Sequence, residues 1–187
     1  IICMHSLVLI KDYVPNIKID LRYATADNIT GHVLYPEARA YLNHDAVLAL
    51  AKVQAILEKN NLSLKIWDAY RPLEVSKELW DATPTEEKQY VADPYQGSVH
   101  NRGCAVDLTL YDTKTQKDIV MPSGFDDFSE RAWPGFKDAP KEQLKERDLL
   151  HSLMESHGFS VEPDEWWHFN WKDWEKYPVL HTPIEAL

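Results

Sequence analysis

The stretch Cys-Ala-Val-Asp-Leu-Thr-Leu-Tyr at residues 104–111 decides the fold class, because it has the clearest strand pattern in the chain. Apolar side chains occupy every second position from Cys104 to Leu110, so they share one face of the predicted strand. Asp107 lies on the opposite face, beside small or polar neighbours. The sequence therefore predicts a strand that presents a carboxylate from its less apolar face.

Outward from this strand, helical and extended patterns follow one another along the chain. Apolar residues at spacings of three and four predict a helix from Asn43, its N-cap, to Asn61. Pro140 near the start and Gly158 at the end mark a second long helix that begins near Asp138. The other predicted elements are a strand at 64–70, a helix at 73–81, a shorter helix and loops at 83–97, and strands at 158–161 and 166–171. Helices that bracket short strands in this irregular order predict an α+β fold.

Composition and charge limit the kinds of partner. With 187 residues, 44% hydrophobic and 27% charged, the chain is typical of a soluble globular protein with a single domain over residues 1–187. Thirty acidic and twenty basic residues give a net charge of -10, the wrong sign for nucleic acid or an anionic lipid surface. The longest apolar run, around residues 6–10, is far shorter than the roughly 20 residues that span a bilayer. We therefore expect no nucleic-acid or membrane partner, and no obligate protein partner is evident.

Two segments carry the residues best suited to chemistry: Ser-Val-His-Asn-Arg-Gly-Cys-Ala-Val-Asp at 98–107 and Glu-Trp-Trp-His at 165–168. Together they supply two histidines, one aspartate and a spare glutamate. Catalytic zinc sites typically use three ligands of this kind and leave a fourth position to water, whose pKa falls to about 7 when bound. The candidate metal ligands are His100, Asp107 and His168, and the candidate general base is Glu165.

The spacing of Glu165 and His168 restricts their geometry. Residues three apart in a regular strand point to opposite faces, so both could not approach one metal ion from within such a strand. The turn-forming pair Pro163-Asp164 favours Glu165 as the residue outside the strand. We therefore expect Glu165 to lean from the turn toward the attacking water while His168 ligates from the strand.

Each of these residues also has an ordinary structural interpretation. A lone His100 is more often a surface or loop histidine, and Asp107 could cap a neighbouring turn. Glu165 stands beside two tryptophans and could be a half-buried carboxylate with a raised pKa, which is also the property that a general base needs. Because these residues occur together, the functional interpretation is favoured.

The pattern Ser-x-His-x-x-Gly-x-Ala-x-Asp at 98–107, with the later Glu-x-x-His, resembles the zinc D-alanyl-D-alanine dipeptidases of the vancomycin-resistance type. The resemblance extends to three further blocks at 23–31, 67–72 and 125–126. It implies an α+β domain with a small central antiparallel sheet flanked by helices, similar to hedgehog and D,D-peptidase domains. It also implies one Zn²⁺ per chain and a small D,D-dipeptide as the substrate.

Carried over residue by residue, the resemblance implies that His100, Asp107 and His168 bind zinc. Glu165 would take a proton from the attacking water and pass it to the leaving amine. Arg71 would stabilise the oxygen that becomes negative in the tetrahedral intermediate. The alternative for Arg71 is a structural pair with a nearby carboxylate.

The resemblance also implies a small substrate pocket. Asp126 would receive the free amino group of the substrate, and Tyr23, Tyr35 and Ser98 would line the pocket. A carboxylate at the amino end would accept a dipeptide and exclude a longer peptide, because an extra residue would clash and leave a buried charge unpaired.

The expected function is zinc-dependent hydrolysis of D-alanyl-D-alanine or a related D,D-dipeptide. The stretch ahead of Ser98 is shorter than in the family, which predicts a pocket open on one side. This keeps a D,D- or L,D-carboxypeptidase acting on muropeptides as an alternative. A non-catalytic zinc-bearing binding module is a second alternative, since hedgehog domains resemble this fold. The bacterial cytoplasm is slightly favoured over the periplasm as the compartment.

Overall fold

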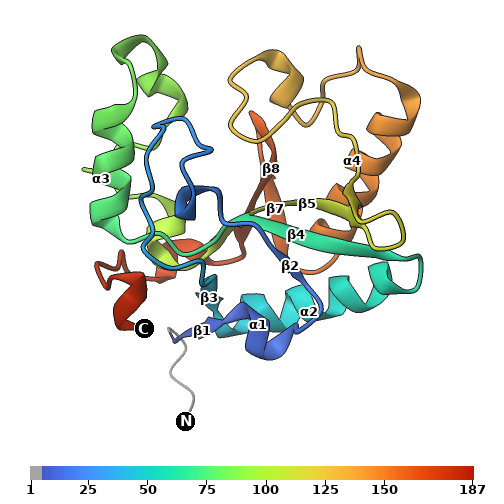
Figure 1. The fold of residues 1–187 in the computed structure, drawn as a ribbon, viewed down its shortest axis with the longest axis horizontal. Coiled ribbons are helices and arrows are strands. Elements are labelled where there is room, and N and C mark those ends of the chain that lie inside the picture. The colour runs from blue at the N-terminus through green and yellow to red at the C-terminus, as the bar shows by residue number, and fades with distance from the viewer. Residues whose placement is uncertain (1–5) are drawn as a thin grey trace.

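The computed structural model describes residues 6–187, and its central feature is a six-stranded sheet (Figure 1). The strands lie in the order β2-β4-β5-β8-β7, and the short strand β6 also pairs with β5. The pairs from β4 to β7 are antiparallel, as predicted, whereas β2 pairs with β4 in parallel at one edge. The strands of this sheet are β2 (Lys18–Ile19), β4 (Leu62–Asp68), β5 (Ala105–Asp112), β6 (Lys117–Asp118), β7 (Phe159–Glu162) and β8 (Glu165–Trp171).

Helices flank the sheet, with α3 and α4 on opposite sides of the view and α2 running below the strands (Figure 1). The two long helices, α2 and α4, pack against the sheet, α2 on β4 and α4 on β5, β7 and β8. The predicted cap of α2 is confirmed, because the side chain of Asn43 accepts a hydrogen bond from the backbone N–H of Asp45 at 3.1 Å. The α-helices described are α1 (Ile10–Tyr13), α2 (His44–Glu58), α3 (Leu73–Ala82) and α4 (Lys141–Glu155).

Short elements connect the larger ones. A two-stranded sheet pairs β1 (Leu7–Leu9) with β3 (Tyr41–Asn43). Over residues 6–187 no helix has the length and apolar character needed to cross a membrane. The 3-10 helices in this part of the chain are η1 (Arg22–Ala24), η2 (Thr85–Tyr90), η3 (Val99–Arg102), η4 (Glu130–Ala132), η5 (Trp174–Lys176) and η6 (Ile184–Ala186).

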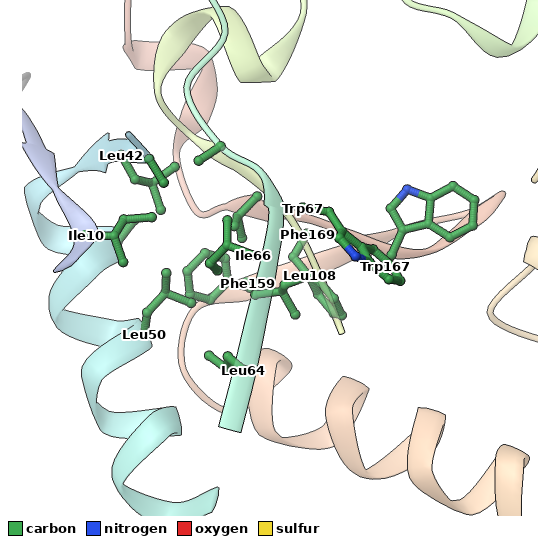
Figure 2. Close-up of a cluster of buried hydrophobic side chains, with 14 of the residues drawn as sticks. Ile10, Leu42, Leu50, Leu64, Ile66, Trp67, Leu108, Phe159, Trp167 and Phe169 are labelled. Atoms are coloured by element: carbon green, nitrogen blue, oxygen red, sulfur yellow. The ribbon is translucent and has the colours of Figure 1, made fainter. Parts of the chain in front are cut away.

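The core lies on both faces of the central strands. Figure 2 shows Ile10, Leu42 and Leu50 on one side of β4, with Trp67 and Trp167 on the other. All six residues from 105 to 110 on β5 are buried. A buried leucine or valine side chain contributes about 1.5–3 kcal/mol relative to an exposed one, so β5 is firmly held between β4 and β8. The carboxylate of Asp107 on this strand consequently has a fixed position.

The β7–β8 hairpin corrects one prediction. Glu165 is the first residue of β8 and pairs with Glu162, so the prediction that it lies outside the strand is wrong. Val161, the residue before Glu162 in β7, pairs with Phe169. The two successive β7 residues thus pair with β8 residues four apart, and β8 has three extra, unpaired residues between them. Such an irregularity breaks the alternation of faces. Glu165 and His168 can therefore face the same cavity from one strand.

Candidate active site

Three elements bring the predicted metal ligands together. His100 lies in η3 rather than in a loop, Asp107 lies in β5, and His168 lies in β8 directly opposite Asp107 in the strand register. Nε2 of His100 is 3.3 Å from Oδ2 of Asp107, and Nδ1 of His168 is 3.1 Å from Oδ1. One ligand atom from each residue lies within 4.8 Å of the other two. The three residues form a candidate metal centre.

The turn that presents His100 is built by its neighbours. The Ser98 hydroxyl accepts a hydrogen bond from the backbone N–H of His100 at 3.1 Å, and the Asn101 side chain accepts one from the backbone of Ser98 at 2.7 Å. This reciprocal cap fixes the start of η3. The helix ends at Gly103, whose φ of 67° lies in the left-handed region, and a Cβ there would clash with the Leu7 side chain.

The hydrogen bond that each imidazole makes on the side away from Asp107 determines which ring nitrogen faces the aspartate. Nδ1 of His100 lies 2.8 Å from the carbonyl oxygen of Ala69, which can only accept, so this nitrogen donates and Nε2 faces Asp107. Nε2 of His168 lies 2.7 Å from Oδ1 of Asn170. The arrangement leaves one nitrogen of each ring directed at the carboxylate.

The orientation of Asn170 is itself determined by a carboxylate. Its Nδ2 donates to Oε1 of Glu162 at 2.8 Å, so its oxygen must be the atom that accepts from His168. Sequence analysis missed both Asn170 and Glu162. Asn170 stands two residues from His168 on the same strand face, which is the one sequence signal that could have indicated it.

The donor set fits a small divalent cation. Among the described residues, the buried Oδ1 of Asp107 has no hydrogen bond of acceptable geometry, although Nδ1 of His168 is only 3.1 Å away. Two imidazole nitrogens and a carboxylate this close repel one another unless protons or a metal ion lie among them. Imidazole and carboxylate ligands suit several first-row divalent metals, zinc among them.

The charges of the three residues show the same preference for a cation. Burial lowers the pKa of His168, but the adjacent carboxylate of Asp107 outweighs this effect and raises the pKa to about 10. Burial would raise the pKa of Asp107, yet His100 and His168 hold it well below its usual range. Without a metal ion the carboxylate thus favours a proton on His168, and a bound cation would displace that proton.

Glu165 borders the same cavity as the three ligands. Burial raises the pKa of Glu165 to about 8, with the positive charge of His168 opposing the shift and the charge of Asp107 adding to it. A carboxyl group with a pKa near neutrality can both accept and release a proton at physiological pH. The sequence predicted such a proton-exchanging carboxyl group at Glu165 in the turn, and in the structure Glu165 is the first residue of β8.

Arg71 is held by a carboxylate that sequence analysis did not single out. Its Nε and Nη2 donate to Oδ2 of Asp68 at 3.1 and 2.7 Å, and Asp68 is fully buried. The hydroxyl of Tyr35 donates to the other oxygen of Asp68 at 2.6 Å. The structural pair considered for Arg71 therefore exists, and the guanidinium also lines the cavity.

The predicted substrate-binding residues fall into two groups. The Tyr23 hydroxyl donates to Oδ2 of Asp126 at 2.6 Å, and both residues line the cavity together with Ser98. Tyr35 does not line this cavity. Tyr35 instead lines a separate cavity of about 330 Å³ near Pro72, and it contacts the site through its hydrogen bond to Asp68 and through the ring of Tyr23, with the two ring centroids 6.0 Å apart.

A single cavity of about 70 Å³ connects these groups. Of the nine residues that the sequence predicted for the site, all except Tyr35 line it. A metal-ligand cluster that shares a small cavity with a carboxyl group able to exchange protons is typical of metal-dependent peptidases. This is the class that the α+β fold and the site define.

Comparison with known proteins identifies the family within this class. A family model described as D-ala-D-ala dipeptidase, Peptidase_M15, matches residues 4–184, and the chain belongs to this family. The D-alanyl-D-alanine dipeptidase of Escherichia coli (strain K12) is 42% identical over 166 residues, which are 89% of this chain and 84% of that protein. The D-alanyl-D-alanine dipeptidase of Enterococcus faecium is 31% identical over 194 residues, covering 92% and 94%.

Solved structures show a more distant likeness. The vancomycin resistance D,D-dipeptidase VanXYg, in complex with a D-Ala-D-Ala phosphinate analogue, is 16% identical with a TM-score of 0.46. The match covers 89% of this chain and 66% of that one.

Proposed function

We propose that residues 1–187 form a single domain that hydrolyses D-alanyl-D-alanine, or a related D,D-dipeptide, with the help of one zinc ion. The observation that carries the proposal is the convergence of His100, Asp107 and His168 on the cavity that also contains Glu165. Relatives that are 42% and 31% identical over most of the chain are named D-alanyl-D-alanine dipeptidases, which supports this substrate.

Zinc would be held by Nε2 of His100, Nδ1 of His168 and a carboxylate oxygen of Asp107. Nε2 of His100 and Nδ1 of His168 lie 3.3 and 3.1 Å from the two different oxygens of Asp107. One donor atom of each residue lies within 4.8 Å of the other two, so the three residues could hold one small cation. When bound, zinc polarises the scissile carbonyl and lowers the pKa of a bound water to about 7.

Glu165 would move the proton. In its ionised form the carboxylate accepts a proton from the attacking water, and the protonated form then donates it to the nitrogen of the leaving D-alanine. The raised pKa of Glu165, about 8, matches a group that must perform both steps near neutral pH.

Arg71 would stabilise the charge that develops on the carbonyl oxygen. Asp68 uses Nε and Nη2, which fixes the guanidinium plane, so Nη1 can donate to the oxygen of the tetrahedral intermediate. Tyr35 would act by positioning Asp68 rather than by touching the substrate. Loss of one such oxyanion donor commonly lowers kcat by about 10²–10³-fold.

Asp126 would bind the substrate's ammonium group, with Tyr23 orienting the carboxylate and Ser98 lining the pocket beside it. This arrangement favours a dipeptide over the carboxypeptidase alternative, because a residue added at the amine would leave the Asp126 charge without its partner. The presence of Glu165 and Arg71 in the cavity argues against the non-catalytic alternative.

The test combines a metal assay with D-alanyl-D-alanine turnover. Glu165→Ala should abolish measurable turnover and still bind one zinc per chain, because Glu165 is not a ligand. Asp138→Asn, at an exposed position, is the control and should keep wild-type turnover. Full dipeptidase activity in the Glu165→Ala variant would show that the assigned mechanism is wrong.

A further inference from the structure

Two aromatic rings from separate segments are stacked at the edge of the site cavity. The rings of Tyr90 and Phe128 have centroids 5.0 Å apart and an interplanar angle of 10°. Tyr90 ends η2 in the segment 83–97, and Phe128 stands two residues after Asp126 in the segment 119–129. Offset stacking at this distance is a favourable aromatic geometry. The stack therefore brings together two segments that border the cavity.

The position of the stack places it between the cavity and the surface. Tyr90 and Phe128 line the catalytic cavity, and both also line a small hollow of about 10 Å³ beside Trp133. Glu165 borders both spaces. Since 42% of Tyr90 is exposed, the outer side of the stack faces solvent. A molecule moving from that side toward Glu165 meets these two rings.

The stack can open without breaking a hydrogen bond. Within residues 6–187, no hydrogen bond or ion pair joins segment 83–97 to segment 119–129. The polar contacts of these segments either lie within one segment, such as Ser129 N–H to Asp127 Oδ1 at 2.7 Å, or join segment 119–129 to other parts of the chain, such as Trp166 Nε1 to Ser123 Oγ at 2.8 Å. Aromatic stacking adds only modest stabilisation beyond the area it buries. Separation of the rings is therefore the lowest-cost way to enlarge this end of the cavity.

The catalytic cavity is small, with a volume of about 70 Å³. Separation of the two rings would enlarge it at this end. Asp126 and both rings line the same cavity, so a group attached to the substrate's amine would lie near the rings. The two rings consequently lie where they would contact a substrate that is longer at its amino end.

We propose that Tyr90 and Phe128 form an aromatic gate that opens to admit a dipeptide and, when closed, excludes substrates acylated on the amine. The proposal rests on the proposed function and adds two residues that determine specificity.

The first test compares free with N-acetylated D-alanyl-D-alanine as substrates of the zinc-loaded enzyme. Tyr90→Ala and Phe128→Ala should each raise the ratio of kcat/KM for the acetylated to the free dipeptide by about tenfold. The charge of Asp126 is the same in every variant, so it cancels from this comparison. Tyr90→Phe keeps the ring and should retain the wild-type ratio. Tyr95→Ala, in the same segment and 89% exposed, is the matched surface control.

A second measurement separates the gate from the peptidase activity. The rate at which dipicolinate removes zinc from the loaded enzyme reports access to the site without requiring turnover. Tyr90→Ala and Phe128→Ala should raise this rate about tenfold, and Tyr95→Ala should not. A raised rate in enzyme that cleaves no D,D-dipeptide would overturn the proposed function and leave the gate standing. Folded variants with both the substrate ratio and the removal rate unchanged would overturn the gate.

Discussion

The orientation of His168 depends on a chain of two hydrogen bonds, from its Nε2 to Asn170 and from Asn170 to Glu162. Partners that hold a ligand imidazole typically contribute 10–100-fold to metal affinity. Asn170→Ala should therefore weaken zinc binding about 10–100-fold, measured by competition with a chelator of known affinity. Asn60→Ala, at an exposed position, is the control. Unchanged zinc affinity in Asn170→Ala would show that strand packing alone orients the ring.

The substrate-binding carboxylate should make the KM depend on pH. Burial raises the pKa of Asp126 to about 7, although the hydrogen bond from Tyr23 opposes the shift. A raised pKa means that the group becomes protonated as the pH falls below about 7, and a neutral acid cannot pair with an ammonium group. The KM for D-alanyl-D-alanine should accordingly increase as the pH is lowered from 8 to 6 in steady-state assays.

The Asp126→Asn variant provides the control for this prediction. It should have a raised KM at every pH and should lose the increase below pH 7, because the amide does not titrate. Asp127→Asn, at the neighbouring position, should keep the wild-type profile. An identical pH dependence of KM in wild type and Asp126→Asn would assign the titration to another group.

At the scale of single elements, α2 is attached to the sheet by a buried face. Leu50 packs in the core cluster and is fully buried (Figure 2). Leu48 on the same helix is 41% exposed. Leu50→Ala should lower the free energy of unfolding by about 2–5 kcal/mol through lost burial and the cavity left behind. Leu48→Ala should change it by less than about 0.5 kcal/mol. Urea denaturation measures both, and equal effects would contradict this packing.

The hairpin β7–β8 shows where element prediction succeeds and where it fails. The two strands and their turn could be recognised from local alternation and from Pro163-Asp164. The sequence argument also required that Glu165 and His168 not both belong to one regular strand, but its placement of Glu165 outside the strand is wrong. The form of the irregularity was not predictable, because the three extra residues in β8 arise from pairing with β7 and β5 rather than from the local sequence.

At the scale of the whole molecule, the candidate metal centre joins η3, β5 and β8. A ligand that binds only the folded state stabilises it, by about 2.7 kcal/mol at 100 times Kd. Free zinc at 100 times its Kd should raise the Tm of the metal-free protein by about 5–10 °C in a thermal scan. The increase should be lost in His100→Ala and kept in His32→Ala, an exposed histidine. A Tm that chelation leaves unchanged would argue against a metal bound by all three elements.

The sequence by itself determined the principal strand, the long helices, both segments that carry the chemistry and the resemblance to zinc dipeptidases. These features depend on residues close together in the chain, whose periodicity and spacing are visible without a structure. Only the tertiary structure decided the contacts between distant segments. Tyr35 reaches Asp68 behind Arg71, Glu162 orients Asn170, and Glu165 shares the cavity with the ligands. The physical reason is that strand register and packing determine which distant polar groups meet, and no local pattern encodes that register.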